Sequence, residues 1–246
     1  MKIVKKIAPK INAYFRNLRF SHYIKLKSPK TKLVDLKLFN KDYLNKDNIL
    51  TQIMNNYGSD KGSTHHNYTD FYHFLFENLR NKKLNIFEVG LGSIDPNFSF
   101  NMTLVQKNSP LCSLRAWKEY FPDSQIFGAD IDTSILDNEE RIKTFFVDML
   151  SKDTIFLMWK KINQKMDIII DDGFHSFEAN TTFFENSIAY LNDYGIYIIE
   201  DIHRNPKIIK KYVNYFNKIG FSWQFVDIKN LNNVRDNCLI LIKKNI

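Results

Sequence analysis

Short apolar runs of strand length alternate with longer amphipathic stretches from about residue 49 to the end of this 246-residue chain. This alternation predicts a mostly parallel α/β sheet with helices on both faces, because parallel strands need long crossover connections. Too few residues separate the last two runs for a helical crossover, so these strands should pair antiparallel. We place the strands at Leu84–Val89, Gln125–Ala129, Lys143–Val147, Asp167–Ile170, Gly195–Ile199, Ser222–Asp227 and Cys238–Ile242. The main helices are expected at Asn48–Tyr57, Thr69–Leu79 with Thr69 as its cap, Ser113–Tyr120, Glu178–Leu191 and Pro206–Ile219.

Residues 1–48 differ in character from residues 49–246, and we treat them as a basic helical N-terminal arm. Residues 1–37 hold eleven lysines and arginines against one acid, whereas the rest of the chain is slightly acidic. Apolar residues recur there at helical spacing, with Pro9 interrupting. The arm is expected to pack on the main domain or on a second subunit, and attraction to anionic lipid headgroups is the alternative.

Charge and composition exclude several classes of protein. The net charge of +8 comes from the arm, so the main domain is not the basic platform that nucleic-acid binding needs. No apolar run approaches the ~20 residues of a membrane-spanning helix. With two cysteines, Cys112 and Cys238, neither a disulfide framework nor a thiolate zinc site is expected. We therefore expect a cytoplasmic protein with no transmembrane segment and no nucleic-acid substrate.

Acidic residues follow five successive predicted strands. In an open parallel sheet, ligands bind beyond the carboxyl ends of the strands. Each acid alone is ordinary, since aspartate often caps the next helix, but together they place carboxylates along a single edge. The polar residues at these ends are Glu88, Asp130, Asp132, Asp148, Asp171, Asp172, His175, Glu200, Asp201 and His203.

The turn Gly90-Leu91-Gly92 after the first strand is typical of a nucleotide-binding loop, where backbone approaches a ligand closely. A dinucleotide fold would favour a third glycine where this chain has Asp95 and Pro96. An anionic cofactor also fits poorly beside so many carboxylates. S-adenosylmethionine is cationic and carries a ribose diol that Asp130, at the end of the second strand, is placed to hold.

Six ordered segments and a preceding one resemble a known family. The segments are Tyr57–Gly62 with Tyr68, Phe87–Gly92, Ser113–Pro122, Ile126–Asp132, Arg141–Lys143, Ile168–His175 and Ile198–Asp201. They are similar to the class I S-adenosylmethionine-dependent O-methyltransferases of the macrocin and mycinamicin type, and more closely to relatives in bacterial capsule and lipopolysaccharide gene clusters, which methylate sugar hydroxyls. The resemblance spans about residues 50–245 and implies a Rossmann-like, seven-stranded sheet with a reversed last strand. It departs from the capsule-type relatives in the loop 93–112, which is not glycine-rich here.

The resemblance also implies roles for individual residues. His175 would be the general base, beside Asp172, and Mg²⁺ would be held by Asp172, Glu200 and Asp201. Imidazole is suited to accept a hydroxyl proton during attack, which contributes ~10²–10⁴-fold in rate. The residues implied at the S-adenosylmethionine pocket are Tyr57, Glu88, Gly90, Gly92, Ser113, Arg115, Asp130, Asp148 and Asp171.

The expected function is methyl transfer from S-adenosylmethionine to a sugar hydroxyl, on a nucleotide-activated hexose or heptose destined for capsule or lipopolysaccharide. The alternatives are an O-methyltransferase for another small polar or phosphorylated metabolite, and a module that binds the cofactor without catalysis. A third, RNA methylation, would need the arm to supply all of the positive charge. We also expect a homo-oligomer.

Overall fold

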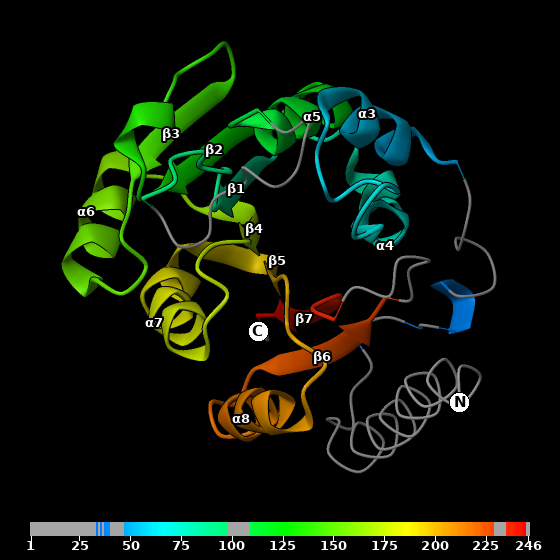
Figure 1. Cartoon of the computed structure of the whole chain (residues 1–246), viewed down its shortest axis with the longest axis vertical. Coiled ribbons are helices and arrows are strands. Elements are labelled where there is room, and N and C mark those ends of the chain that lie inside the picture. The colour runs from blue at the N-terminus through cyan, green and yellow to red at the C-terminus, as the bar shows by residue number, and fades with distance from the viewer. Residues whose placement is uncertain are drawn as a thin grey trace, which may run out of the picture.

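A computed structural model describes residues 33, 35, 37–39, 47–97, 109–228 and 235–244. Seven strands in these ranges form one twisted sheet in the order β3-β2-β1-β4-β5-β7-β6 (Figure 1). Strand β7 is antiparallel to both of its neighbours, and the other pairs are parallel. The predicted fold class is confirmed. The strands are β1 (Asn85–Val89), β2 (Gln125–Asp130), β3 (Ile142–Phe146), β4 (Met166–Asp171), β5 (Leu191–Ile199), β6 (Ser222–Asp227) and β7 (Cys238–Lys243).

The central strands end in register. Val89, the last residue of β1, is paired with Ala129 of β2 and with Asp171 of β4, and Asp171 is paired with Ile199 of β5. The segments that follow these strands therefore begin at the same edge of the sheet. This alignment brings together polar residues that are far apart in the sequence.

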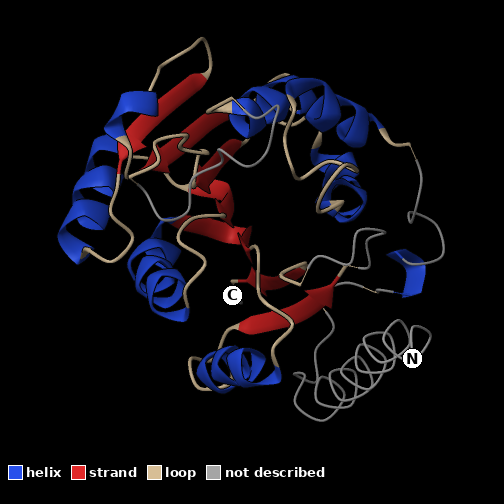
Figure 2. Ribbon diagram, in the orientation of Figure 1, coloured by secondary structure: helices blue, strands red, loops and turns tan. Residues whose placement is uncertain are grey.

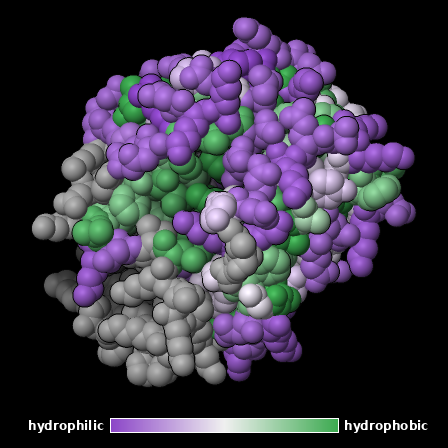
Figure 3. Space-filling view, turned by 180° about the vertical axis from the view of Figure 1, so that it is seen from behind, coloured by the Kyte–Doolittle hydropathy of each residue, from purple (hydrophilic) through white to green (hydrophobic). Residues whose placement is uncertain are grey.

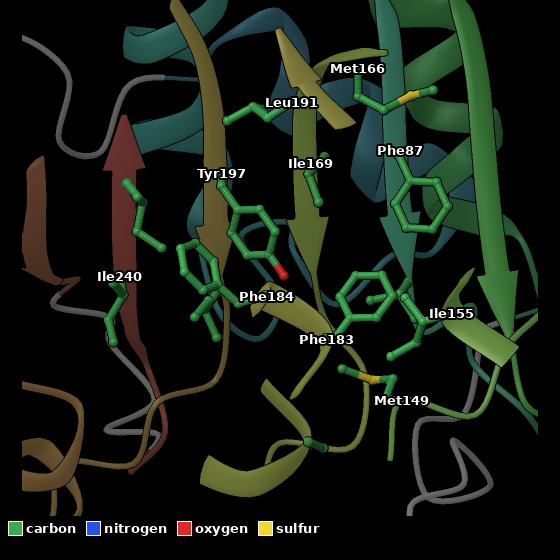
Figure 4. Close-up of a cluster of buried hydrophobic side chains, with 14 of the residues drawn as sticks. Phe87, Met149, Ile155, Met166, Ile169, Phe183, Phe184, Leu191, Tyr197 and Ile240 are labelled. Atoms are coloured by element: carbon green, nitrogen blue, oxygen red, sulfur yellow. The ribbon is translucent and has the colours of Figure 1, made fainter. Parts of the chain in front are cut away.

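Helices cover both faces of the sheet (Figure 2). One face packs against α3, α4 and α5, and the other packs against α6, α7 and α8. In the second layer, Phe183 and Phe184 of α7 lie against Phe87, Ile169 and Tyr197 of the sheet (Figure 4). The helices are α3 (Ile49–Tyr57), α4 (Tyr68–Phe76), α5 (Cys112–Tyr120), α6 (Lys152–Ile162), α7 (Phe177–Ser187) and α8 (Pro206–Phe216).

The alternation of side chains along each strand decides which layer a residue meets. Ile86 and Ile198 belong to the core under α3–α5, so Glu88 and Glu200, two positions later, continue toward that layer. Ile169 belongs to the core under α6–α8, and Asp171 follows it. Neighbouring acids at the same strand ends are thus directed to opposite sides of the sheet.

Two helices differ from the sequence predictions. Helix α6 is absent from the helices placed by sequence; Ser151 caps it, accepting a hydrogen bond from the Thr154 amide. Helix α4 begins after Asn67, in the left-handed region, rather than at a Thr69 cap. The Thr69 hydroxyl instead accepts a hydrogen bond from Thr51 of α3, at 2.7 Å. Thr69 is therefore a buried residue that bonds to another helix, and it does not cap α4.

Most of the arm lies outside the described residues, and so does its predicted helical structure. Phe39 is described, and its ring packs edge-on against Phe71 of α4 at 5.3 Å. Seen from behind, the described surface is mostly hydrophilic with hydrophobic patches between the polar areas (Figure 3). None of the described helices is long and apolar enough to cross a membrane. Cys112 and Cys238 are both buried and form no disulfide.

Candidate active site

A cavity of about 400 Å³ opens beyond the carboxyl ends of β1, β2, β3, β4 and β5. Its lining includes backbone of the turn after β1, carboxylates after β2, β3 and β5, and the loop after β4. The structure therefore brings most of the predicted site residues to one place. Those that line the cavity are Gly90, Gly92, Ser113, Asp130, Asp148, Asp172, His175 and Asp201.

The turn after β1 needs its first glycine for a steric reason. Gly90 has φ +92°, and a Cβ atom there would lie 2.0 Å from the backbone oxygen of Asp172. Only glycine allows the β1 and β4 loops to approach this closely. Gly92 also has a positive φ, of 81°. Both glycines line the cavity.

The half of the cavity next to β2 and β3 has carboxylates held by backbone amides. Asp130 accepts hydrogen bonds from the Leu91 amide at 2.6 Å and from the Asp132 amide at 2.9 Å. Burial raises the pKa of Asp130, and these backbone hydrogen bonds oppose the rise. Asp148 accepts from the Leu150 amide at 2.9 Å. Each carboxylate keeps acceptor capacity toward the cavity, which suits hydroxyl or amino groups of a ligand.

The other half, beyond β4 and β5, holds an acidic centre around Asp172, Glu200 and Asp201. Lys61, from the α3–α4 connection, donates to Asp172 Oδ2 and to Glu200 Oε2, the latter at 2.7 Å. Its ammonium also lies 3.7 Å from Glu88 Oε1. Although burial alone would lower it, these carboxylates keep the pKa of Lys61 well above its ordinary value. Lys61 is therefore a permanent positive charge among the acids.

Asp201 is held by three side chains. The Tyr68 hydroxyl donates to Asp201 Oδ1 at 2.7 Å, and Asp201 Oδ2 lies 3.7 Å from His66 Nε2 and 3.8 Å from His175 Nε2. Burial alone would raise the pKa of Asp201, but the nearby histidines and the Tyr68 hydrogen bond lower it. Asp201 is thus a carboxylate that faces two imidazoles.

His175 and Asp201 both have left-handed backbone, with φ of 48° and 56°. Such non-glycine residues cost conformational energy and cluster at functional sites. The conformation places the His175 side chain, 27% exposed, at the cavity beside Asp201 and Asp172. One ligand atom from each of Asp172, His175 and Asp201 falls within a 4.8 Å group. Two carboxylates and an imidazole are a donor set that a divalent cation accepts.

Asp172 lies among charges that act on it in opposite directions. Burial raises its pKa to about 7; Asp201 adds to the rise, and Lys61 and His175 oppose it. Carboxylates this close repel each other unless cations or protons compensate them. A divalent cation bound here would relieve that repulsion, so the residues fit such an ion.

Five predicted site residues do not line the cavity, which in each case reflects where the side chain points. Glu88 is buried beneath it and accepts from Ser113 and Trp117, each at 2.6 Å. Asp171 lies on the other face of the sheet and accepts from Asn180 at 3.0 Å. Glu200 is held by Tyr72 and Lys61. Arg115 pairs with Glu139 at 2.6 Å, and Tyr57 interacts with Glu119.

Sequence reasoning missed the contribution of the segment 59–72. Lys61, His66, Tyr68 and Tyr72 all bond to or flank the acids, and Ser59, Asp60 and Lys61 line the cavity. The resemblance to a pre-core segment was the available signal. It gave no partners, because the acids lie more than 100 residues away in the chain.

Comparison with known proteins places the chain beside sugar O-methyltransferases. No protein-family profile matches it. It is 30% identical over 146 residues to 8-demethyl-8-alpha-L-rhamnosyl tetracenomycin-C 2'-O-methyltransferase of Streptomyces olivaceus, covering 59% of this chain and 35% of that protein. It is 30% identical over 155 residues to mycinamicin VI 2''-O-methyltransferase of Micromonospora griseorubida, covering 62% and 36%. The chain thus spans about a third of the length of these relatives.

Solved structures show the same fold. The mycinamicin-pathway methyltransferase MycE, in complex with Mg and S-adenosylhomocysteine, has a TM-score of 0.59 and 23% identity, covering 80% of this chain and 55% of that one. A second MycE structure, which also contains mycinamycin VI, has a TM-score of 0.59 and 21% identity, covering 87% and 64%. This likeness establishes the Rossmann-like methyltransferase fold for the described residues.

Proposed function

We propose that this chain is an S-adenosylmethionine-dependent O-methyltransferase that acts on a sugar hydroxyl. The observation that carries the proposal is the division of one cavity into two halves. Asp130 and the glycine turn lie in one half, and His175, Asp172 and Asp201 lie in the other. The sugar O-methyltransferases to which the chain is similar support the same reaction.

For the cofactor, we propose that Asp130 binds the ribose hydroxyls and Asp148 the adenine amine. Gly90 and Gly92 let the backbone approach the ligand, and Ser113 lies near its amino-acid end. Glu88 acts on this pocket indirectly, through Ser113 and Trp117, which donate hydrogen bonds to it. When bound, S-adenosylmethionine supplies a methyl group activated by the sulfonium.

For the acceptor, His175 accepts the hydroxyl proton as the oxygen attacks the methyl carbon in line with the departing sulfur. Asp201, 3.8 Å from His175 Nε2, stabilises the imidazolium that results. The cavity walls hold the two reactants together, which contributes up to ~7–11 kcal/mol through positioning. Mg²⁺ on Asp172 and Asp201 would supply positive charge for neighbouring sugar hydroxyls.

The family resemblance and the relatives point to different acceptors. The resemblance implies a nucleotide-activated hexose or heptose for capsule or lipopolysaccharide, whereas the relatives' names give antibiotic-attached sugars. A diphosphate needs basic partners. Among the described lining residues, Lys61 is the single lysine or arginine, and acids already bind it. That observation favours a glycoside without a diphosphate. A mass-spectrometric screen of nucleotide sugars and neutral glycosides for a methyl mass increment tests it.

Calorimetry with S-adenosylhomocysteine tests the cofactor assignment. We expect saturable binding to the native chain and a loss of ~10–100-fold in Asp130→Ala, because hydrogen bonds to a charged acceptor contribute ~1.5–3 kcal/mol. Asp137→Ala, an exposed aspartate on the same β2–β3 connection, is the matched control and should bind normally. Absence of binding to the native chain, or tight binding of a nicotinamide dinucleotide, would contradict the proposal.

A further inference from the structure

Lys61 is a fully buried lysine whose ammonium contacts acids from three strand ends. It is 1% exposed and bonds to Asp172 and Glu200, with Glu88 also within salt-bridge distance. A buried ammonium is stable only where carboxylates compensate it. These contacts therefore form a fixed ionic centre, built by a segment that precedes the first strand.

Both carboxylate oxygens of Glu200 accept hydrogen bonds within this ionic centre. Its Oε2 accepts from Lys61 at 2.7 Å and its Oε1 accepts from the Tyr72 hydroxyl at 2.5 Å. The residue is 1% exposed and does not line the cavity. Asp172 and Asp201 differ, because both line the cavity and both have an oxygen in the 4.8 Å group with His175.

We propose that Lys61 is the cation that compensates Glu200 and Glu88, and that the divalent ion is held by Asp172 and Asp201 without Glu200, with His175 kept as the base. This inference rests on the metal assigned under the proposed function. It removes Glu200 from the ligand set that the family resemblance implies. Lys61 is then a positioning residue, which fixes the Asp172 carboxylate from one side while the ion binds from the other.

The shared carboxylate has an electrostatic consequence. An ammonium and a divalent cation that both bind Asp172 repel each other, and in the protein interior that repulsion is only partly screened. Lys61 must therefore weaken metal binding. Without its charge, Glu88 and Glu200 would be uncompensated, and Glu200 would be free to coordinate the ion.

Calorimetric titration of the full chain with Mn²⁺, without cofactor or acceptor, tests the ligand set. We expect Asp201→Asn to weaken Mn²⁺ binding tenfold or more, since it removes a ligand charge. Glu200→Gln keeps the shape of the side chain and should change the affinity less than about threefold, because Glu200 does not touch the ion. The exposed Glu140→Gln is the control and should bind like the native chain.

Lys61→Met tests the repulsion. Methionine has the unbranched shape of lysine, one heavy atom shorter, and carries no charge, so we expect Mn²⁺ to bind at least tenfold more tightly. Part of the gain should persist in Lys61→Met/Glu200→Gln, because the repulsion is absent there too, and the part that is lost measures coordination by the released Glu200. If Lys61→Met does not fold, Glu200→Gln in the native background decides the question alone.

Three results would overturn the inference: a loss in Glu200→Gln as large as in Asp201→Asn, weaker Mn²⁺ binding in Lys61→Met, or no Mn²⁺ binding by the native chain. Failure of the proposed methyltransferase function is a separate result. It would show as absent S-adenosylhomocysteine binding, whatever the Mn²⁺ titrations give.

Discussion

The two halves of the cavity hold their carboxylates in different ways. Beside β2 and β3, Asp130 and Asp148 accept hydrogen bonds from backbone amides of their own edge. Beside β4 and β5, Asp172, Glu200 and Asp201 are held by side chains, which come from residues 61–72. One half is built by the sheet itself, and the other needs a separate segment.

This difference predicts how sensitive each half of the cavity is to substitution. A backbone amide donates whatever its side chain is. The half beside β2 and β3, here called the amide-held half, should therefore tolerate changes in neighbouring residues other than the glycines of the turn after β1. The acidic centre depends on the chemistry of Lys61, His66, Tyr68 and Tyr72, and a change in any of them redistributes charge. We therefore expect substitutions in one half to leave the other half's binding intact.

Substitution of His175 should impair catalysis strongly without affecting cofactor binding, and this is the largest change that we predict. His175→Ala should lower methyl transfer by ~10²–10⁴-fold, because the imidazole takes the acceptor proton in the transition state. S-adenosylhomocysteine affinity should change less than about threefold, since the cofactor lies in the amide-held half. Turnover and calorimetry on the same preparation measure both quantities. His73→Ala, on α4 and bonded to Tyr120, is the control and should keep its turnover.

Near-native turnover of His175→Ala from pH 6 to 9 would remove the general base from the mechanism. Catalysis would then rest on positioning alone. If His175→Ala also lost affinity for S-adenosylhomocysteine, the two halves of the cavity would act as one site.

The amide-held half and the antiparallel pairing of the last two strands were accessible from the sequence. Glycine turns and acids that follow apolar runs are local patterns, and they predicted Gly90, Asp130 and Asp148 at one edge. The short connection between the last strands predicted their antiparallel pairing, which the structure confirms. In each case the information lies within a few residues of the feature.

The acidic centre was only partly accessible, for two physical reasons. A buried lysine looks like a solvated one in sequence, and the partners of Lys61 lie 111 and 139 residues away. Strand ends also leave side-chain direction undecided until the register is known. Asp171 and Asp172 are adjacent, yet Asp171 bonds to Asn180 of α7 while Asp172 lines the cavity.

The second prediction uses Asp171, which lies outside both halves. Burial raises its pKa to about 6, against 3.8 for the ordinary group. The folded state therefore holds a proton that the unfolded state releases, and stability from this group is lost as pH rises from about 4 through about 6. Asp171→Asn has no proton to lose. Its stability relative to the native chain should rise by about 2 kcal/mol between pH 4.5 and 7.

Urea unfolding of both proteins at each pH measures this difference, and other titrating groups cancel because they are common to both. Asp153→Asn, exposed on α6, is the control and should show no such trend. A flat difference for Asp171→Asn would mean that Asp171 ionises normally.

The smallest change that we predict concerns Arg115, which tests how far the amide-held half extends. The resemblance puts Arg115 near the amino-acid end of the cofactor, but the structure pairs its Nε with Glu139 Oε1 at 2.6 Å and its Nη1 with the Pro110 carbonyl at 3.2 Å. Both side chains of this pair are about 30% exposed, at 31% and 27%. Arg115→Gln should thus lower the free energy of unfolding by no more than about 1 kcal/mol, as for other partly exposed ion pairs. Its affinity for S-adenosylhomocysteine should stay within about threefold of native, whereas a tenfold loss would mean that the guanidinium leaves Glu139 to bind the cofactor carboxylate.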